Sequence, residues 1–415
     1  MFSSRLPPHL ARNRLSQALD ARRAAGEPIL DLTLSNPTRA DFDYPPDLLA
    51  PLADPRALTY DPRPFGSIEA RRAVAGDYAR QGLDVSPDRI VLTASTSDAY
   101  SLLFKLLANP GDEVLVPRPS YPLFDHLTQL ESIVARPYDL EYHGAWTIDA
   151  ASVERAFGDR TRAVLIVSPN NPTGSFVKRD ELDRLAALCA RRGRDVAIVA
   201  DEVFADYEVD PGAARAAGRV SGRRDVLSFA LGGLSKSVGL PQVKLGWIAA
   251  AGPDTIVEAA LARLELICDT YLSVSTPAQV AAAALLNRGG VVRAQIAERV
   301  GTNYTWLASK CGSSSCTCRR TEGGWYAVLQ VPTLEPEEDL VVRLLIKDGV
   351  LTHPGYFFDF HHESFLVVSL LTPQAILTEG VGRILRHFDC TPSDAASGAS
   401  APREASEWGR DPTRN

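Results

Sequence analysis

The sequence predicts an α/β protein, with a mostly parallel sheet between helices as the large domain and a smaller α+β C-terminal domain. The chain has 415 residues, which at about 150 residues per domain corresponds to two or three domains. In its middle part, short apolar runs alternate with longer helix-patterned segments, which is typical of strand–helix units. After about residue 285 this rhythm changes, which indicates a second kind of domain.

Five short apolar runs predict the strands of the large sheet. Each is nearly continuous in Val, Ile, Leu or Ala, as expected for parallel strands that are buried on both faces. The longer segments between them would form the helices that cover the sheet. The runs are Arg89–Thr93, Glu113–Pro117, Ala163–Ser168, Asp195–Ala200 and Asp225–Ala230.

The elements after residue 285 predict the smaller domain. A helix-like stretch, Val291–Lys310, precedes a strand-like run at 323–332, a second helix at Glu337–Lys347 and a strand at 364–371. We therefore divide the chain into four parts. They are an N-terminal arm with part of the small domain (1–44), a large cofactor-binding domain (45–285), the small C-terminal domain (286–390) and a tail (391–415) whose Ala, Ser, Pro and charged residues predict disorder.

Composition argues against several classes of function. Lys and Arg number 44 against 51 Asp and Glu, a net charge of −7 that attracts neither nucleic acid nor anionic lipid. No apolar run approaches the ~18 residues of a membrane helix, and the first residues lack the apolar stretch of a secretory signal, so we expect a cytoplasmic protein. Cys311, Cys316 and Cys318 fall in one segment without a partner pair of ligands, so we expect a surface loop and no metal.

Chemistry-bearing side chains follow the predicted strands. Because the carboxyl ends of parallel strands lie along one edge of the sheet, where ligands bind in such folds, we expect these side chains to meet. Each has a structural explanation when taken alone: a helix cap, a packed ring, a turn, an ion pair or a solvated lysine. They are Ser95, Thr96, Ser97, Tyr121, Asn171, Asp201 and Lys236.

Together these groups match one ligand, a phosphorylated pyridine aldehyde. The hydroxyls before a helix predicted at Asp98–Leu107 would bind the phosphate, Tyr121 would stack on the ring, and Asn171 would donate to its phenolic oxygen. Asp201 would keep the ring nitrogen protonated, so that the ring accepts electrons from the substrate α-carbon. Lys236 would bond to the aldehyde and, once displaced by a substrate amine, move the proton.

Five motifs carry a resemblance to a known family. They are YDPRPFGSIEARRAV (60–74), PGDEVLVPRPSYP (110–122), SPNNPTG (168–174), ADEVF (200–204) and LSKSVGLPQVKLGW (234–247). Through them, roughly residues 28–390 resemble the fold type I pyridoxal-phosphate enzymes, specifically the class I/II aminotransferases. The resemblance implies pyridoxal 5'-phosphate as cofactor, and an amino donor and a keto acceptor as small-molecule partners.

The resemblance also implies roles for individual residues. Lys236, Asp201 and Asn171 match the Schiff-base lysine, the partner of the pyridine nitrogen and the donor to the phenolic oxygen. Tyr121 matches the stacking aromatic ring. Tyr60 matches a tyrosine that reaches the phosphate of the neighbouring subunit, which implies a homodimer with shared active sites. The remaining cofactor positions are Ser95, Thr96, Ser97, Ser235 and Lys244, and Asn36 resembles the segment that passes over the substrate.

Three cofactor positions differ from the family. Phe204 stands where the family has Tyr, which removes a donor to the phenolic oxygen. Lys244 stands where an Arg usually binds the phosphate, which keeps the charge and loses the bidentate fork. Gly233 replaces a serine. We expect these changes to retune the cofactor without abolishing its binding.

A fourth difference concerns the substrate. The family binds the α-carboxylate with an Arg in a late strand, and Val367 occupies that position here. Either another cation takes the role or the substrate has no α-carboxylate. We favour a relocated cation, with Arg39 first among Arg39, Arg63, Arg118 and His353. The nearby aromatic segment 353–363 would form either an apolar substrate wall or core packing.

The first hypothesis is therefore an aminotransferase that acts on an amino acid or related amine. The second is a decarboxylase, lyase or synthase that uses the same cofactor, which Val367 and Phe204 bring into consideration. The third is a non-catalytic, cofactor-binding regulatory module. Such modules usually carry a DNA-binding helix-turn-helix, and only about 30 residues precede Asp31 here.

Overall fold

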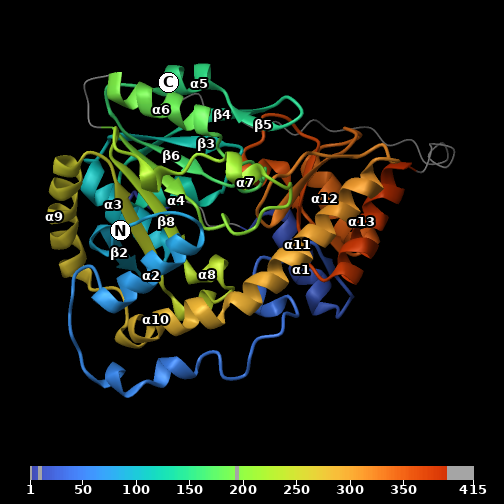
Figure 1. The fold of residues 1–415 in the computed structure, drawn as a ribbon. Helices are drawn as coiled ribbons and strands as arrows, with labels where there is room; N and C mark the ends of the chain where they lie inside the picture. The colour runs from blue at the N-terminus through green and yellow to red at the C-terminus, as the bar shows by residue number, and fades with distance from the viewer. Residues whose placement is uncertain (1, 8–11, 192–195, 390–415) are drawn as a thin grey trace, which may run out of the picture.

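The computed structural model describes residues 2–7, 12–191 and 196–389. The predicted disordered tail at 391–415 and the start of the run predicted at Asp195 lie outside the described residues. Figure 1 shows a large sheet with helices on both sides and a smaller group of strands and helices formed mainly by the last third of the chain.

The large sheet has eight strands in the order β2-β9-β8-β7-β6-β3-β4-β5. Neighbouring strands from β8 to β4 run parallel, whereas β9 is antiparallel to both of its neighbours and β5 is antiparallel to β4. The predicted mostly parallel sheet is thus confirmed. The strands are β2 (Ile90–Thr93), β3 (Glu113–Arg118), β4 (Val134–Tyr142), β5 (Trp146–Ile148), β6 (Thr161–Val167), β7 (Ala197–Asp201), β8 (Ser228–Gly233) and β9 (Gly246–Ala251).

Strand β8 begins three residues later than its apolar run predicts. Asp225 is held by Arg223 in an ion pair of 2.6 Å, which keeps the start of the run in a turn. The strand instead continues through Gly232 and Gly233, both buried and paired with β9. Glycines carry no apolar signal, so the pattern ended too early.

Helices cover both faces of the sheet because successive residues of its buried strands point to opposite sides. Ile90, Leu115 and Ile198 belong to the larger core, and Val91, Val114 and Val199 to the core on the other face. The larger core packs against α2 (Ile68–Arg80), α6 (Arg179–Arg191) and α10 (Thr276–Arg288), and the second against α3 (Thr96–Leu107), α4 (Leu123–Leu130) and α9 (Asp254–Tyr271). The short helices α5 (Ala150–Ala156), α7 (Ala213–Ala216) and α8 (Leu234–Ser237) connect strands.

The smaller domain is built on a four-stranded antiparallel sheet in the order β10-β11-β14-β13. Its strands are β10 (Thr317–Cys318), β11 (Tyr326–Gln330), β13 (His353–Pro354) and β14 (Phe365–Ser369). The N-terminal segment joins it, because β1 (Leu30–Asp31) pairs in parallel with β12 (Val350–Leu351). Its helices are α1 (Arg14–Ala24), α11 (Gly290–Cys311), α12 (Glu337–Asp348) and α13 (Gln374–Asp389). The four-part division of the chain remains a prediction.

The cysteine segment differs from its prediction. Cys311 and Cys316 are buried and Cys318 is half-buried, and burial raises the pKa of each thiol. The expected surface loop is wrong because the apolar end of α11 and strand β10 pack these side chains inward. In the described part of the chain no His, Cys, Asp or Glu cluster could hold a metal, and no helix there has the length and apolarity to cross a membrane.

Candidate active site

The register of three neighbouring strands brings the predicted site residues to one edge of the sheet. Val167, which ends β6, pairs with Asp201, which ends β7, and Asp201 pairs with Leu231 of β8. The chain leaves β6 toward Asn171 and leaves β8 toward Lys236 on α8. The amide, the carboxylate and the amine therefore emerge beside one another, as expected for the carboxyl edge of a parallel sheet.

Asp201 ends β7, the middle one of these three strands. Its carboxylate accepts hydrogen bonds from the backbone N–H of Val203 at 3.2 Å and from the hydroxyl of Tyr100 at 3.3 Å. Burial raises the pKa of Asp201 to about 6, although both donors and the charge of Lys236 favour ionisation. The alternative explanation, an ion pair with arginine, does not hold, because the nearby Arg219 pairs instead with Glu202 at 2.8 Å.

Lys236 lies near Asp201 in an apolar setting. Its Nζ lies 4.9 Å from the ring centroid of Trp325 and 5.7 Å from that of Phe204. Burial lowers the pKa of Lys236 to about 8, and the charge of Asp201 partly opposes this shift. A lysine so placed is more often neutral near pH 7.5 than a solvated one, as a nucleophile or base requires.

The turn that carries Asn171 is braced by its neighbour. The side-chain amide of Asn170 donates to Pro119 O at 3.0 Å and to Thr173 Oγ1 at 2.9 Å, and the N–H of Gly174 donates to Asn170 O at 2.7 Å. Asn171 itself is buried, and its Oδ1 has no hydrogen-bond partner among the described residues. A buried amide without partners is costly unless a ligand uses it.

The predicted phosphate cup lies at the N-terminus of α3. The helix begins at Thr96, two residues earlier than predicted, because Ser95 rather than a later hydroxyl is the cap: its Oγ accepts from Asp98 N at 3.1 Å. Thr96 and Ser97 therefore lie in the first turn, where backbone N–H groups are free for an anion. Ser235 is half-buried beside Lys236, whereas Lys244 is exposed, with its backbone in the left-handed region at φ 58°.

Tyr121, which is expected to stack on the ring, and the altered positions Phe204 and Gly233 each have defined neighbours in the structure. Tyr121 precedes α4, is 41% exposed and meets Phe124 edge-on at 6.5 Å. Phe204 is buried and packs on Trp325 at 5.2 Å, so an aromatic contact occupies the place of the missing tyrosine. At Gly233 an added Cβ would lie 3.2 Å from Gly246 Cα, so the close approach of β8 and β9 favours glycine there.

Four residues of this site were not predicted from the sequence: Ser35, Tyr100, Trp325 and Tyr326. Tyr100 contacts Asp201 from the second turn of α3. Trp325 faces Lys236, and the ring of Tyr326 lies 6.5 Å from that of Phe204 while its hydroxyl hydrogen-bonds the side chain of Ser35. The sequence offered one usable signal, the aromatic pair that follows Gly323-Gly324 at the start of a strand.

Val367 lies inside an apolar cluster. It is fully buried with Val328, Phe358 and Phe365, and the partly buried Phe360 packs against the same group. The backbone N–H of Ser120 donates to Phe358 O at 3.0 Å, which fixes the aromatic segment against the loop of Tyr121. Of the two interpretations of segment 353–363, core packing is the one that Phe358 satisfies.

Three of the four candidate cations are engaged or neutral. Arg63 pairs with Asp61 at 2.8 Å, and Arg118 pairs with Asp139 at 2.8 Å. Burial lowers the pKa of His353 to about 4, so this ring is neutral at physiological pH. Arg39 is exposed and pairs with no carboxylate in the part of the chain that the structure describes.

Arg39 lies on a segment fixed at the end of β14. Leu32 O accepts from the N–H of Ser369 at 2.7 Å, and the hydroxyl of Ser369 donates to Leu34 O. Ser35 then reaches Tyr326, and the side chain of Asn36 caps the short turn Pro37–Arg39 by accepting from the N–H of Thr38 at 3.1 Å. The predicted substrate segment therefore passes next to the rings around Lys236.

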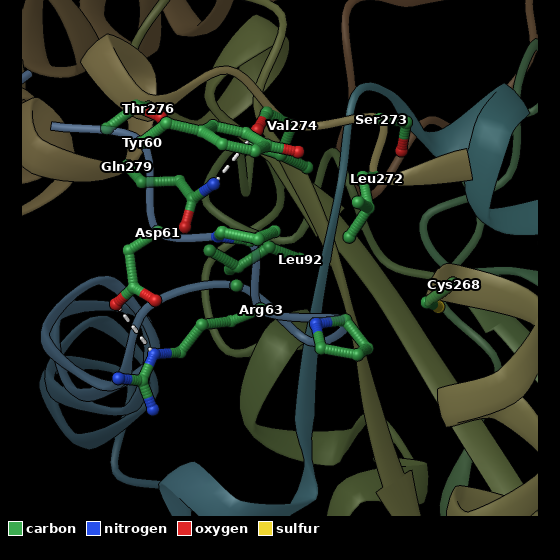
Figure 2. Close-up of a pocket in the computed structure, with 13 residues that line it drawn as sticks. Tyr60, Asp61, Arg63, Leu92, Cys268, Leu272, Ser273, Val274, Thr276 and Gln279 are labelled. Carbon is green, nitrogen blue, oxygen red and sulfur yellow. Dashed lines mark hydrogen bonds and ion pairs between the residues drawn. The ribbon is translucent and has the colours of Figure 1, made fainter. Parts of the chain in front are cut away.

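Tyr60 lies elsewhere, 71% exposed, among the residues that line a separate pocket (Figure 2). Gln279 joins the two walls of this pocket, because it accepts from Ser67 N at 2.7 Å and donates to Val274 O at 2.9 Å. No other predicted cofactor residue lines it. Within one subunit, Tyr60 is therefore not brought to Lys236.

A half-buried lysine, a carboxylate and a buried amide at the carboxyl edge of a parallel sheet, with a helix N-terminus nearby, form an arrangement typical of pyridoxal-phosphate-dependent enzymes. The chain belongs to the aminotransferase class I and II family, whose model matches residues 46–384. It is an enzyme of this pyridoxal-phosphate-dependent family.

Two curated relatives show the degree of similarity. The chain is 27% identical over 379 residues to an alanine aminotransferase of Mycobacterium tuberculosis, covering 87% of this chain and 84% of the relative. It is 29% identical over 258 residues to the glutamate-pyruvate aminotransferase AlaA of Escherichia coli, covering 61% of this chain and 62% of that protein.

Solved structures show the same fold. An alanine aminotransferase from Pyrococcus furiosus superposes with a TM-score of 0.83 at 22% identity, covering 94% of this chain and 99% of the other. An aspartate aminotransferase from Thermotoga maritima superposes with a TM-score of 0.76 at 24% identity, covering 91% and 97%.

Proposed function

We propose that this enzyme transfers an amino group between a small α-amino acid and a keto acid, with Lys236 as the residue that holds the cofactor covalently and moves the proton. The observation that carries the proposal is the placement of Lys236 Nζ near Asp201 in an apolar setting that lowers the lysine pKa to about 8. The names of the two curated relatives support alanine or glutamate as donor and pyruvate or another keto acid as acceptor.

The residues fit pyridoxal phosphate on chemical grounds. The side-chain amide of Asn171 makes no hydrogen bond among the described residues, so its NH2 group is available to donate to the phenolic oxygen, and Lys236 donates no hydrogen bond through Nζ to any described residue. The free N–H groups and hydroxyls at the start of α3, with Ser235, would hold the phosphate, and Tyr121 would cover the ring. When bound, the cofactor supplies an electron sink for the electron pair left at the substrate α-carbon.

The chain's own residues then do three things. Asp201, ionised above its pKa of about 6, would hold a proton at the pyridine nitrogen, and Tyr100 keeps its carboxylate in place. Lys236 Nζ, partly neutral at physiological pH, would take the proton from the substrate α-carbon and return it to the carbon that carries the cofactor's aldehyde group. The rings of Phe204 and Trp325 exclude water around the amine.

For the substrate carboxylate we propose Arg39. Arg63 and Arg118 are already paired with aspartates, His353 is neutral, and Val367 is enclosed in an apolar cluster. Loss of one charge-assisted contact costs about 1.5–3 kcal/mol. Arg39→Ala should therefore raise KM for amino acids about 10- to 100-fold, and Arg39→Lys less.

A homodimer with shared sites is the second part of the proposal. Leu58, at 89% exposed, lies two residues before Tyr60, and Tyr271, at 56% exposed, stands next to Leu272 of the pocket wall in Figure 2. Large apolar side chains so exposed favour burial against another protein surface. A second copy would cover them and bring Tyr60 to the phosphate of its neighbour.

The test of the function uses purified protein loaded with pyridoxal phosphate. Borohydride should fix a reduced adduct on the peptide that contains Lys236, and Lys236→Ala should lose it. A panel of amino donors should then change the cofactor absorbance, and keto acids should reverse the change. Arg39→Ala should respond normally to amines without a carboxylate.

The same panel separates the alternatives. Release of carbon dioxide or an eliminated group, without a change that keto acids reverse, would indicate a decarboxylase or lyase and contradict transamination. A Lys236→Ala protein that keeps its full function in cells would instead support a regulatory module.

A further inference from the structure

An aromatic surface covers the amine of Lys236, and Trp325 forms its nearer half. The Nζ lies 4.9 Å from the centroid of this ring, within the ~6 Å at which a ring face attracts a cation. Phe204, at 5.7 Å, forms the other half and meets Trp325 edge-on. Trp325 is 1% exposed, so water does not weaken the contact from its side.

The backbone holds Trp325 in this place from two directions. The N–H of Gly324 donates to Tyr207 O, and the N–H of Leu370 donates to Trp325 O, both at 2.7 Å. The hydroxyl of Tyr207 in turn donates to the carbonyl of Lys236 at 2.5 Å. The segment that carries the indole, just before β11, and the short helix α8 that carries the lysine are therefore linked through one tyrosine.

A packing role alone does not explain a tryptophan at this position. The Nε1 of Trp325 is buried and has no acceptor among the described residues. A buried N–H without a partner costs free energy that phenylalanine would avoid. Tryptophan does have the ring face with the strongest attraction for a cation.

Few charged groups act on Lys236, so the ring face of Trp325 can have a measurable effect on the pKa of the amine. Asp201 on β7 is the one charged group whose interaction with Lys236 is resolved among the described residues. It favours the ammonium form, while burial disfavours that form and outweighs Asp201. A ring face beside the nitrogen would add to the effect of Asp201 and limit the loss of charge.

We infer that Trp325 is a positioning residue for Lys236, whose ring face holds the ammonium form of the amine toward the site and thereby sets the pH at which the lysine becomes a base. This inference rests on the proposed function of Lys236. Because Trp325 directly precedes strand β11 of the smaller domain, the smaller domain would in this way influence proton transfer in the large one.

The test measures the ionisation of Lys236 in the cofactor-free protein. Trace labelling with acetic anhydride across pH, read on the Lys236 peptide by mass spectrometry, gives its pKa directly. Protein is made with tryptophan, 5-fluorotryptophan or trifluorotryptophan, because fluorine weakens the ring face at nearly constant shape. The pKa of Lys236 should fall stepwise, by about half a unit to one unit in all.

Three controls separate the attraction between the Trp325 ring face and the Lys236 ammonium group from other effects of the fluorinated tryptophans. The exposed Lys244, labelled in the same samples, should show no trend, and neither should Lys236 in a Trp325→Phe protein grown with the same analogues. Tyr207→Phe cuts the tie to the Lys236 carbonyl but keeps the indole, so it should retain the trend. If Trp325→Phe does not fold, the series in the natural protein with its Lys244 reference remains decisive.

Borohydride reduction of the loaded protein tells the two possible failures apart. A pKa of Lys236 that does not move with fluorination, in protein that still forms the reduced adduct, would overturn the role of Trp325 and leave the proposed function standing. Absence of the adduct would overturn the proposed function itself.

Discussion

Replacing Val367 by arginine tests directly why this chain lacks the carboxylate anchor of its family. Val367 is 0% exposed and lies between β11 and β13, opposite Val328 on one side and His353 on the other. Val328, Phe358 and Phe365 are buried with it, and His353 is neutral at physiological pH. A guanidinium placed there would be buried among apolar side chains.

The magnitude follows from this burial. An uncompensated buried charge costs about 3–5 kcal/mol, so Val367→Arg should lower the free energy of unfolding by at least that amount. Val367→Ala removes two buried methyl groups at about 0.8 kcal/mol each plus a small cavity term, about 2 kcal/mol in all. Val367→Ile, which keeps the apolar character, is the matched control and should change stability least.

The assay is urea unfolding of the cofactor-free protein, followed by circular dichroism, with KM for amino acids measured on the loaded enzyme. We expect the midpoints to fall in the order isoleucine, alanine, arginine, and KM not to improve with arginine. A Val367→Arg protein as stable as the natural one, with a lower KM for amino acids, would refute the reasoning. It would show that position 367 faces the substrate.

Two further predictions concern buried carboxylates. Burial raises the pKa of Asp201 to about 6 from its ordinary 3.8, so in the cofactor-free protein its ionisation opposes folding increasingly between about pH 4 and 6. Asp201→Asn should therefore raise the urea midpoint more at pH 7.5 than at pH 5 while weakening cofactor binding; an equal gain at both pH values would contradict this. Glu337→Ala should lower the free energy of unfolding by about 3 kcal/mol and speed proteolysis of the aromatic segment, whereas Glu337→Gln should cost less. The reason is that Glu337 accepts hydrogen bonds from the N–H groups of Tyr356, Ser364 and Phe365 at 2.8, 3.0 and 2.8 Å. If Glu337→Ala and Glu337→Gln lower the free energy of unfolding equally, the lost hydrogen bonds are not the cause.

The sequence predicted well the features that depend on residues close together along the chain. Runs of Val, Ile and Leu predicted the buried strands, because a strand covered on both faces needs apolar side chains at every position. The residues that follow those strands predicted Asn171, Asp201 and Lys236 as a group, and the strand register aligns Asp201 with the strand positions that lead to the other two. The start of α3 was missed by two residues, since Ser95, Thr96 and Ser97 are equally good caps by composition.

Only the tertiary structure decided which distant residues complete the site. Trp325 lies 89 positions after Lys236 and Tyr100 lies 101 positions before Asp201, and no spacing rule connects such pairs. The choice of Arg39 among four cations depends on which carboxylates lie near the other arginines, and burial alone makes His353 neutral. Local patterns fix the chemistry that each segment carries, whereas desolvation and pairing depend on which segments the folded chain brings together.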